Sequence, residues 1–480
     1  MADLTSQPAT DTTGATATTP ASGLRGSIGV TGIVFLVVAA AAPLTAVGGA
    51  LPVMFAIGNG PGIPAAYLLV AAVLLLFSVG YAAMSRHVVD AGAFYSYVTA
   101  GLGRVTGAGA AGLALLTYSA VQAGVYGLAG VTAGGLVTKY GGPDLPWWTW
   151  SGILLLLVAV LGYRNIEVGT KVLSLLIVLE VGIVAVVTVA VLVKGGADGI
   201  NLDSFTPHSF SAGSPGIGVM FAVASFVGFE ATAIYGEEAR DPKRSVAKAT
   251  YLAVVLIGVF YALASWAVVL AVGTDKVQGA AAENTAELVF AVGGQYVGTA
   301  ASDLMEILLL TSLFAALLAF HSAIARYLFS LGRQGCAPSA LARSHDRHGS
   351  PHVGSLVQTA SAAVVVAAFA LVGADPVLQL FTWMSGLATL GVLVLMILVS
   401  VAILVFFGRG GADPRLWHTR IAPVLGGLGL CAVAWLVLDN FTTLIGGSAT
   451  LARLFEGVVI LSFAAGALSA VRRRRSGPTD

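Results

Sequence analysis

Two acidic residues lie in apolar surroundings in this 480-residue chain, and an acid at membrane depth is rare and usually functional. Glu180 has only apolar residues or glycine within five positions on either side. It lies ten residues after Thr170, about 15 Å along a helix and so near the middle of a bilayer. Such a carboxyl group could carry a proton, pair with a substrate amine or coordinate a cation. The alternative is a structural glutamic acid that hydrogen-bonds another helix.

The second acid, Glu230, belongs to the stretch 214–250, which begins as an apolar segment of membrane-spanning length. Ser225, Gly228 and Glu230 form a polar, glycine-containing break within this segment, and the acidic pair Glu237–Glu238 and a basic cluster follow. A helix is tolerated as broken at membrane depth only where its loosened backbone faces protein or a cavity. We interpret the break as part of a ligand path. The alternative is a kinked helix that packs against a neighbour.

A third polar set is spaced four residues apart within an apolar segment, so that Tyr118, Gln122 and Tyr126 share one helical face. This stripe could line a cavity or hydrogen-bond a neighbouring helix.

Other reactive residue types have plainer explanations. A lone histidine at depth, His321, is expected to be a hydrogen-bonded packing group, and Asp303 and Glu306 are expected at an outer, solvated end. The two cysteines, Cys336 and Cys431, lack metal-ligand spacing and predict neither a disulfide framework nor a metal site. The sequence contains no HExxH, GxSxG or P-loop motif, so we expect a protein that is not an enzyme and has no cofactor.

The elements that position these residues are membrane helices. The chain is 57% hydrophobic and 10% charged, against about 25% charged in soluble domains. Apolar runs of about 20 residues or more predict twelve transmembrane helices. Their expected ranges are 29–56, 63–85, 105–138, 146–163, 170–194, 215–237, 247–273, 302–331, 354–373, 377–407, 421–438 and 452–471. Residues 1–26, rich in Thr, Ala and Ser, are expected to form a disordered cytoplasmic tail.

The basic residues give the orientation. With a cytoplasmic N-terminus, only Lys139, Lys194, Lys276 and Arg453 of the 24 basic residues lie outside. This strong positive-inside bias predicts a multi-pass protein of the cytoplasmic membrane with both termini in the cytoplasm. The remaining connections include a polar, tyrosine-rich stretch at 87–104, which is expected to form a short cytoplasmic helix.

The first and sixth predicted helices are both interrupted near mid-span. In the first, Pro43 removes a backbone donor and Gly48–Gly49 weakens the helix further. Paired interruptions five helices apart indicate an inverted repeat whose broken helices form the binding site. The expected organisation is a transporter core at 27–407 with repeats at about 27–194 and 214–407. Two scaffold helices (408–471) and a basic cytoplasmic tail (472–480) follow.

Three motifs occur in a characteristic order on these spans. GFEATAIYGEEARDPKRSVAKA resembles the sixth-helix signature of the amino acid–polyamine–organocation permeases. GAFYSYVTAGLGR and ARYLFSLGRQGCAP with the later GSP resemble two further segments of that family, although Gln334 stands where an aspartate is common. The resemblance implies an all-α membrane protein with a LeuT-like five-plus-five inverted repeat and alternating access.

The resemblance also implies a substrate site between the two breaks. Its expected residues are Ala41, Ala42, Pro43, Leu44 and Thr45, and Ala224, Ser225, Phe226, Val227, Gly228 and Phe229. Many family members have a glycine-rich first break and a lysine near the position of Glu180. In this chain Pro43 removes an amide N–H that could bind a substrate carboxylate. Glu180 stands near the position where those members have the positively charged lysine.

We therefore expect a secondary active transporter that imports amino acids, with Glu180 as the first candidate proton carrier and Glu230 as the second. A cationic amine or polyamine permease and an amino-acid exchanger are the alternatives, and Na⁺ is the alternative coupling ion. The expected partners are an amino acid or amine substrate and membrane lipid, with no nucleic acid.

Overall fold

The computed structural model describes residues 29–88, 94–164, 170–230, 232, 239–333, 335, 337–345, 350–410 and 413–476. Predictions about the tail at 1–26, the acidic pair Glu237–Glu238, Gln334 and Cys336 lie outside the described residues.

All regular elements in the described ranges are helices, because an apolar run in a membrane must satisfy its own backbone hydrogen bonds. Nine helical segments there are long and apolar enough to cross a membrane. They correspond to α3 (Ile63–Met84), α5 (Arg104–Lys139), α7 (Thr170–Lys194), α11 (Pro242–Val272), α14 (Thr299–Arg333), α15 (His352–Leu371), α16 (Thr382–Gly408), α17 (Ala422–Leu444) and α18 (Ala449–Ser476).

The other three predicted spans coincide with shorter apolar helices. These are the segment Thr45–Ile57, formed by η1 (Thr45–Ala50) and α2 (Leu51–Ile57), then α6 (Trp147–Tyr163) and α9 (Pro215–Ser225). An apolar helix therefore lies at every predicted position, and a multi-pass membrane protein is confirmed. That all twelve cross the membrane stays a prediction.

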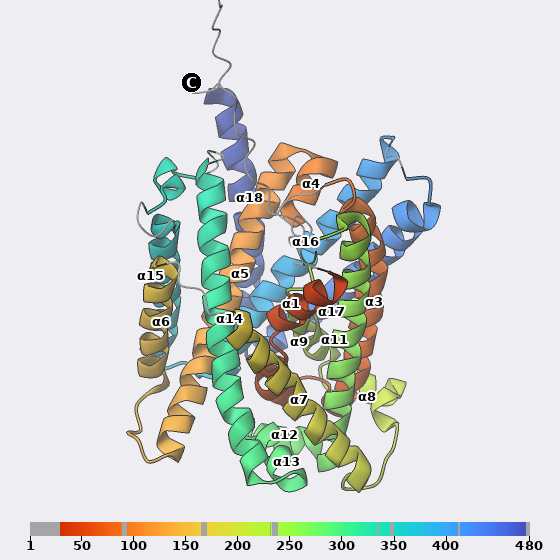
Figure 1. The fold of residues 1–480 in the computed structure, drawn as a ribbon, viewed down its shortest axis with the longest axis vertical. Coiled ribbons are helices and arrows are strands. Elements are labelled where there is room, and N and C mark those ends of the chain that lie inside the picture. Colours follow the sequence, from red (N-terminus) through yellow and green to blue (C-terminus); the bar gives the residue numbers. More distant parts are fainter. Residues whose placement is uncertain are drawn as a thin grey trace, which may run out of the picture.

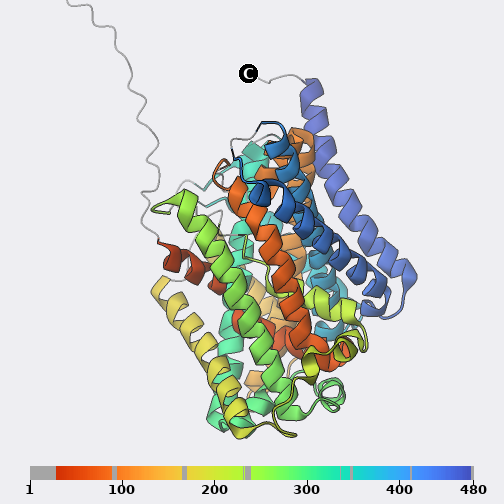
Figure 2. The ribbon, with the colours of Figure 1, turned by 90° about the vertical axis from the view of Figure 1, so that its right-hand side faces the viewer.

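The long helices form one bundle around α5 and α3 (Figure 1). Helix α5 packs against α14, α16 and α18, and α3 packs against α9, α11 and α17. A short helix, α1 (Val30–Ala40), lies against α11 and runs obliquely to the long helices, and α18 runs along the opposite flank (Figure 2). Segments far apart in sequence thus meet in the middle of the bundle.

Short helices occupy the connections. The tyrosine-rich stretch forms α4 (Phe94–Leu102), which confirms the predicted helix there. Helices α12 (Val277–Glu283) and α13 (Leu288–Tyr296) lie between α11 and α14, and η3 (Asp203–Phe205) and α8 (Pro207–Ser211) precede α9. The remaining turns are η2 (Gly60–Gly62), η5 (Ser339–Ala342), η6 (Pro376–Phe381) and η7 (Trp417–Ile421).

Candidate functional site

The first predicted break is present, and it lies just before the proline. Helix α1 ends at Ala40, and Ala42 adopts φ +45°, the only positive φ of a non-glycine residue in the described ranges. The proline ring disfavours helical geometry at the preceding residue, which is why the chain breaks at Ala41–Ala42 and helix resumes at Pro43. At Gly48–Gly49, where the sequence predicted a weakened helix, the chain stays helical but forms the wider turns of the π-helix η1. The hydroxyl of Tyr261, on α11, donates to the freed Ala41 carbonyl at 3.1 Å.

The second break follows α9 directly, as a run of turns at residues 226–230. Gly228 has φ +112°, a conformation that side chains rarely permit, so this position requires glycine. Its N–H donates to the carboxylate Oε2 of Glu230 at 2.8 Å. The Tyr81 hydroxyl on α3 donates to the Glu230 carbonyl at 2.9 Å.

The two breaks touch. A methyl group added to Gly228 would lie 3.0 Å from the Cβ of Ala40 and 3.3 Å from its carbonyl carbon. The end of α1 and the middle of the second break are therefore in backbone contact, although 188 positions separate them in the sequence (228 minus 40). Two unwound segments meet at one place in the bundle.

Glu180 reaches the first break from α7. Its side chain is buried, with 3% exposure, and its Oε2 accepts a hydrogen bond from the Ser312 hydroxyl of α14 at 2.9 Å. The backbone N–H of Leu44, in the first turn after the break, also interacts favourably with this carboxylate. The Thr45 hydroxyl donates to Ser312 at 3.3 Å. One acid thus joins three elements: α7, α14 and the beginning of the resumed helix.

Glu230 is held differently. Its Oε1 accepts a hydrogen bond from the Tyr118 hydroxyl of α5 at 3.2 Å, while Oε2 binds its own loop through Gly228. The carboxylate is buried at 3% exposure, and both of its oxygens have protein donors. It fixes the shape of the second break and ties it to α5.

This geometry agrees with the comparison with known proteins. A model of the family described as "Amino acid permease" matches residues 32–411, which include both breaks and both acids. The chain belongs to the amino acid permease family. The predicted resemblance to amino acid–polyamine–organocation permeases is thereby confirmed, and amino acid transport follows as its general activity.

Named relatives of the permease support the same assignment. It is 23% identical over 410 residues to the branched-chain amino acid permease BcaP of Bacillus subtilis, covering 80% of this chain and 82% of the relative. BcaP of Lactococcus lactis is 27% identical over 406 residues, with 78% and 82% covered. The lysine-specific permease LysP of Lactococcus lactis is 25% identical over 319 residues, with 63% and 62% covered.

The third-span stripe of the permease divides between the site and the packing of helices. Tyr118 contacts Glu230, whereas Gln122 donates to the Leu317 carbonyl at 3.0 Å and accepts from the amide of Gln358. Tyr126 is buried, and its carbonyl accepts a hydrogen bond from Ser151 at 2.8 Å. Gln122 therefore hydrogen-bonds neighbouring helices, which was one of the two alternatives for the stripe.

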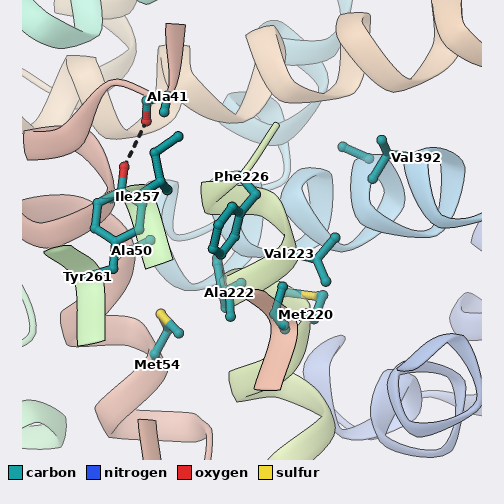
Figure 3. Packing of buried hydrophobic residues seen from close by; sticks show 14 of the residues in the cluster. Ala41, Ala50, Met54, Met220, Ala222, Val223, Phe226, Ile257, Tyr261 and Val392 are labelled. Carbon is teal, nitrogen blue, oxygen red and sulfur yellow. Dashed lines mark hydrogen bonds between the residues drawn. The ribbon is translucent and has the colours of Figure 1, made fainter. Parts of the chain in front are cut away.

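Aromatic side chains close around the second break. Phe226 is 1% exposed, and its ring lies 6.5 Å from that of Tyr261, among buried apolar side chains from α2, α9 and α11 (Figure 3). Phe229 is 2% exposed and packs edge-on against Phe77 of α3 at 6.0 Å. Ser225 hydrogen-bonds Tyr67 of α3 at 3.2 Å. Ala224 and Val227, the other predicted members of this half of the site, are partly exposed.

The remaining sequence candidates lie apart from the breaks. His321 is buried and hydrogen-bonds Ser355 at 2.8 Å, as its interpretation as a packing group predicts. Asp303 and Glu306 both pair with Lys139, at 2.6 and 2.8 Å, and tie the end of α5 to α14. These pairs are partly exposed to solvent and contribute little to stability. In the described ranges no three His, Cys, Asp or Glu side chains cluster as metal ligands would.

Sequence reasoning missed several residues that contact the breaks: Ser312 and Tyr261 at the first, and Tyr67 and Tyr81 at the second. The available signal for Ser312 was a hydroxyl pair, Thr311–Ser312, in the middle of an otherwise apolar span. For Tyr261 no local pattern distinguishes it from the adjacent Phe260.

Proposed function

We propose that the chain imports amino acids across the cytoplasmic membrane by alternating access, as a symporter coupled to protons. The observation that carries the proposal is the pair of touching breaks with Glu180 bound to the first of them. Paired breaks of this kind are typical of transporters built from inverted repeats. Twelve spans in a LeuT-like five-plus-five arrangement would place both breaks near the membrane midplane.

The proposed coupling follows from competition between Glu180 and the substrate carboxylate for the Leu44 N–H. The helix that resumes at Pro43 presents the positive end of its dipole, and this end attracts the carboxylate of an amino acid. Ionised Glu180 attracts the Leu44 N–H and repels a second carboxylate. A protonated Glu180 carries no charge and holds this amide more weakly, because charge-assisted hydrogen bonds are the stronger ones. Substrate and proton therefore favour each other's binding.

The proposed substrate is an amino acid with an apolar side chain. Around Phe226 the buried neighbours, including Met54, Val223 and Ile257, are apolar (Figure 3). The BcaP relatives, which match about four fifths of the chain, are named for branched-chain amino acids. A cationic amine is the second candidate, favoured by the acid in the second break and by the LysP match.

Uptake into proteoliposomes tests the proposal. With the purified chain reconstituted, an inward proton gradient of one pH unit should accumulate leucine up to about tenfold if one proton accompanies each substrate. An ionophore that collapses the gradient is the control and should abolish accumulation. Accumulation that needs a Na⁺ gradient instead would contradict proton coupling. Competition by lysine or putrescine, but not by isoleucine, would favour the cationic candidate.

A further inference from the structure

An arginine with a buried donor that has no partner among the described residues lies just after α3. Arg86 is half-buried, and its Nε atom is buried without a hydrogen-bond partner in the part of the chain that the structure describes. A buried donor without a partner is destabilising, so a bound anion that accepts a hydrogen bond from this Nε atom would be favourable. The end of α3 is flanked by the beginning of α11 and by η7, both of which come from distant parts of the sequence (Figure 1).

Arg415 adds a second positive charge near Arg86. Arg86 and Arg415 both interact electrostatically with Tyr251 of α11 and with His418 of η7. The Nδ1 atom of His418 is also buried without a hydrogen-bond partner among the described residues. Two buried polar atoms without partners therefore belong to the same group of side chains.

Among the described residues, the acid that interacts with this group is Asp413, and Arg415 already binds it. Asp413 accepts a hydrogen bond from Arg415 at 2.9 Å, and the guanidinium holds the pKa of this carboxyl group well below its usual range. Exposed Lys248, one helical turn before Tyr251, adds another positive charge on the same face of α11. The described residues of this group therefore carry a net positive charge.

Apolar side chains border this charge. Exposed Leu416, Trp417 and Ile421 lie beside the basic residues, with 59%, 47% and 46% exposure. On α11, Leu252 and Val255 are also exposed and directly follow Tyr251. Tryptophan next to basic residues is typical of the membrane–water interface.

We propose that Arg86, Arg415 and His418 bind the phosphate of an anionic phospholipid, whose acyl chains lie along the exposed apolar faces of α11 and α17. The basic residues predict that this end of α3 faces the cytoplasm, where the leaflet is rich in anionic lipids. The bound lipid would neutralise Arg86 and bridge α3, α11 and η7.

Native mass spectrometry of the full chain in detergent tests this site. Dioleoylphosphatidylglycerol should remain bound in preference to dioleoylphosphatidylcholine. Arg86→Gln should weaken phosphatidylglycerol binding about fivefold, since each basic residue at an anionic surface contributes on that order. Arg86→Lys keeps the charge and should retain most of the binding. The matched control is Arg164→Gln at the end of α6, on the opposite flank of the bundle, which should bind as the wild type does (Figure 1).

Three results would overturn the proposal: equal binding of the two lipids, an equal loss in Arg86→Gln and Arg164→Gln, or displacement of the phosphatidylglycerol by millimolar inorganic phosphate. The last result would assign the site to a soluble anion. If Arg86→Gln does not yield folded protein, Lys248→Gln on exposed α11 surface provides the same comparison, with a smaller expected loss of about twofold. Full phosphatidylglycerol binding by Lys248→Gln would then contradict the site.

Discussion

The two breaks stabilise their unwound backbone in different ways. The first is short, is followed at once by a new helix, and lies beside an acid from another helix, Glu180 of α7, which interacts with its Leu44 amide. The second is longer, depends on a glycine with positive φ, and binds its own acid, Glu230. An acid on a separate helix can change its affinity for a proton when that helix and the break move apart. An acid within the loop moves with it, which is why we assign proton coupling to Glu180 and shape to Glu230.

The largest effect is expected where the breaks touch. Gly228→Ala forces a side chain into φ +112° and against Ala40, at a cost of about 1–3 kcal/mol. We expect initial leucine uptake in proteoliposomes to fall roughly a hundredfold. Gly457→Ala in α18, with open space around the added methyl, is the matched control and should transport normally. Near-normal uptake by Gly228→Ala would show that contact between the breaks is dispensable.

A smaller loss is expected when the acid of the second break becomes an amide. In Glu230→Gln the amide oxygen can accept from the Gly228 N–H and the amide nitrogen can donate to the Tyr118 hydroxyl. Two hydrogen bonds to a carboxylate thus become weaker neutral ones, at a cost of about 1–2 kcal/mol. The uptake rate should fall roughly thirtyfold while the final accumulation still follows the proton gradient. Glu306→Gln, at the partly exposed pair with Lys139, should change the rate less than twofold. Loss of accumulation with counterflow intact would instead make Glu230 the proton carrier.

Ser312→Ala tests the first break from its other side. It removes the hydroxyl that donates to Glu180 and accepts from Thr45, and hydrogen bonds to charged groups contribute about 1.5–3 kcal/mol. We expect roughly tenfold slower proton-driven uptake. Ser78→Ala removes another buried hydroxyl, one with no hydrogen-bond partner, and should not slow uptake. Equal rates in the two variants would remove Ser312 from the site.

The smallest effect is expected at the carbonyl of the first break. Tyr261→Phe removes the donor to Ala41, a neutral hydrogen bond that contributes about 0.5–1.5 kcal/mol. The Michaelis constant for leucine should rise roughly threefold with little change in maximal rate. Tyr296→Phe, which loses a longer 3.4 Å bond to Ala271, is the control. An unchanged Michaelis constant in Tyr261→Phe would mean that this hydroxyl does not support the break.

The sequence predicted the breaks because their causes are local. A proline acts on the residue before it, and a glycine permits a positive φ wherever it lies, so Pro43 and Gly228 mark both interruptions. The burial of Glu180 was equally local, since its apolar neighbours adjoin it in the chain. Its partners were not predictable, because Ser312 lies 132 positions away and only helix packing brings it to α7. The same holds for Gln122, whose partner Gln358 is 236 positions distant.

Proton uptake on substrate binding tests the role of Glu180 most directly. Leucine added to the purified chain in weakly buffered solution should draw about one proton per bound substrate, measured with a pH indicator and calorimetry. Glu180→Gln should bind leucine with no proton uptake and with pH-independent affinity, and it should keep counterflow exchange but lose accumulation. Glu230→Gln should still take up the proton. Proton uptake by Glu180→Gln equal to that of the wild type would contradict the account.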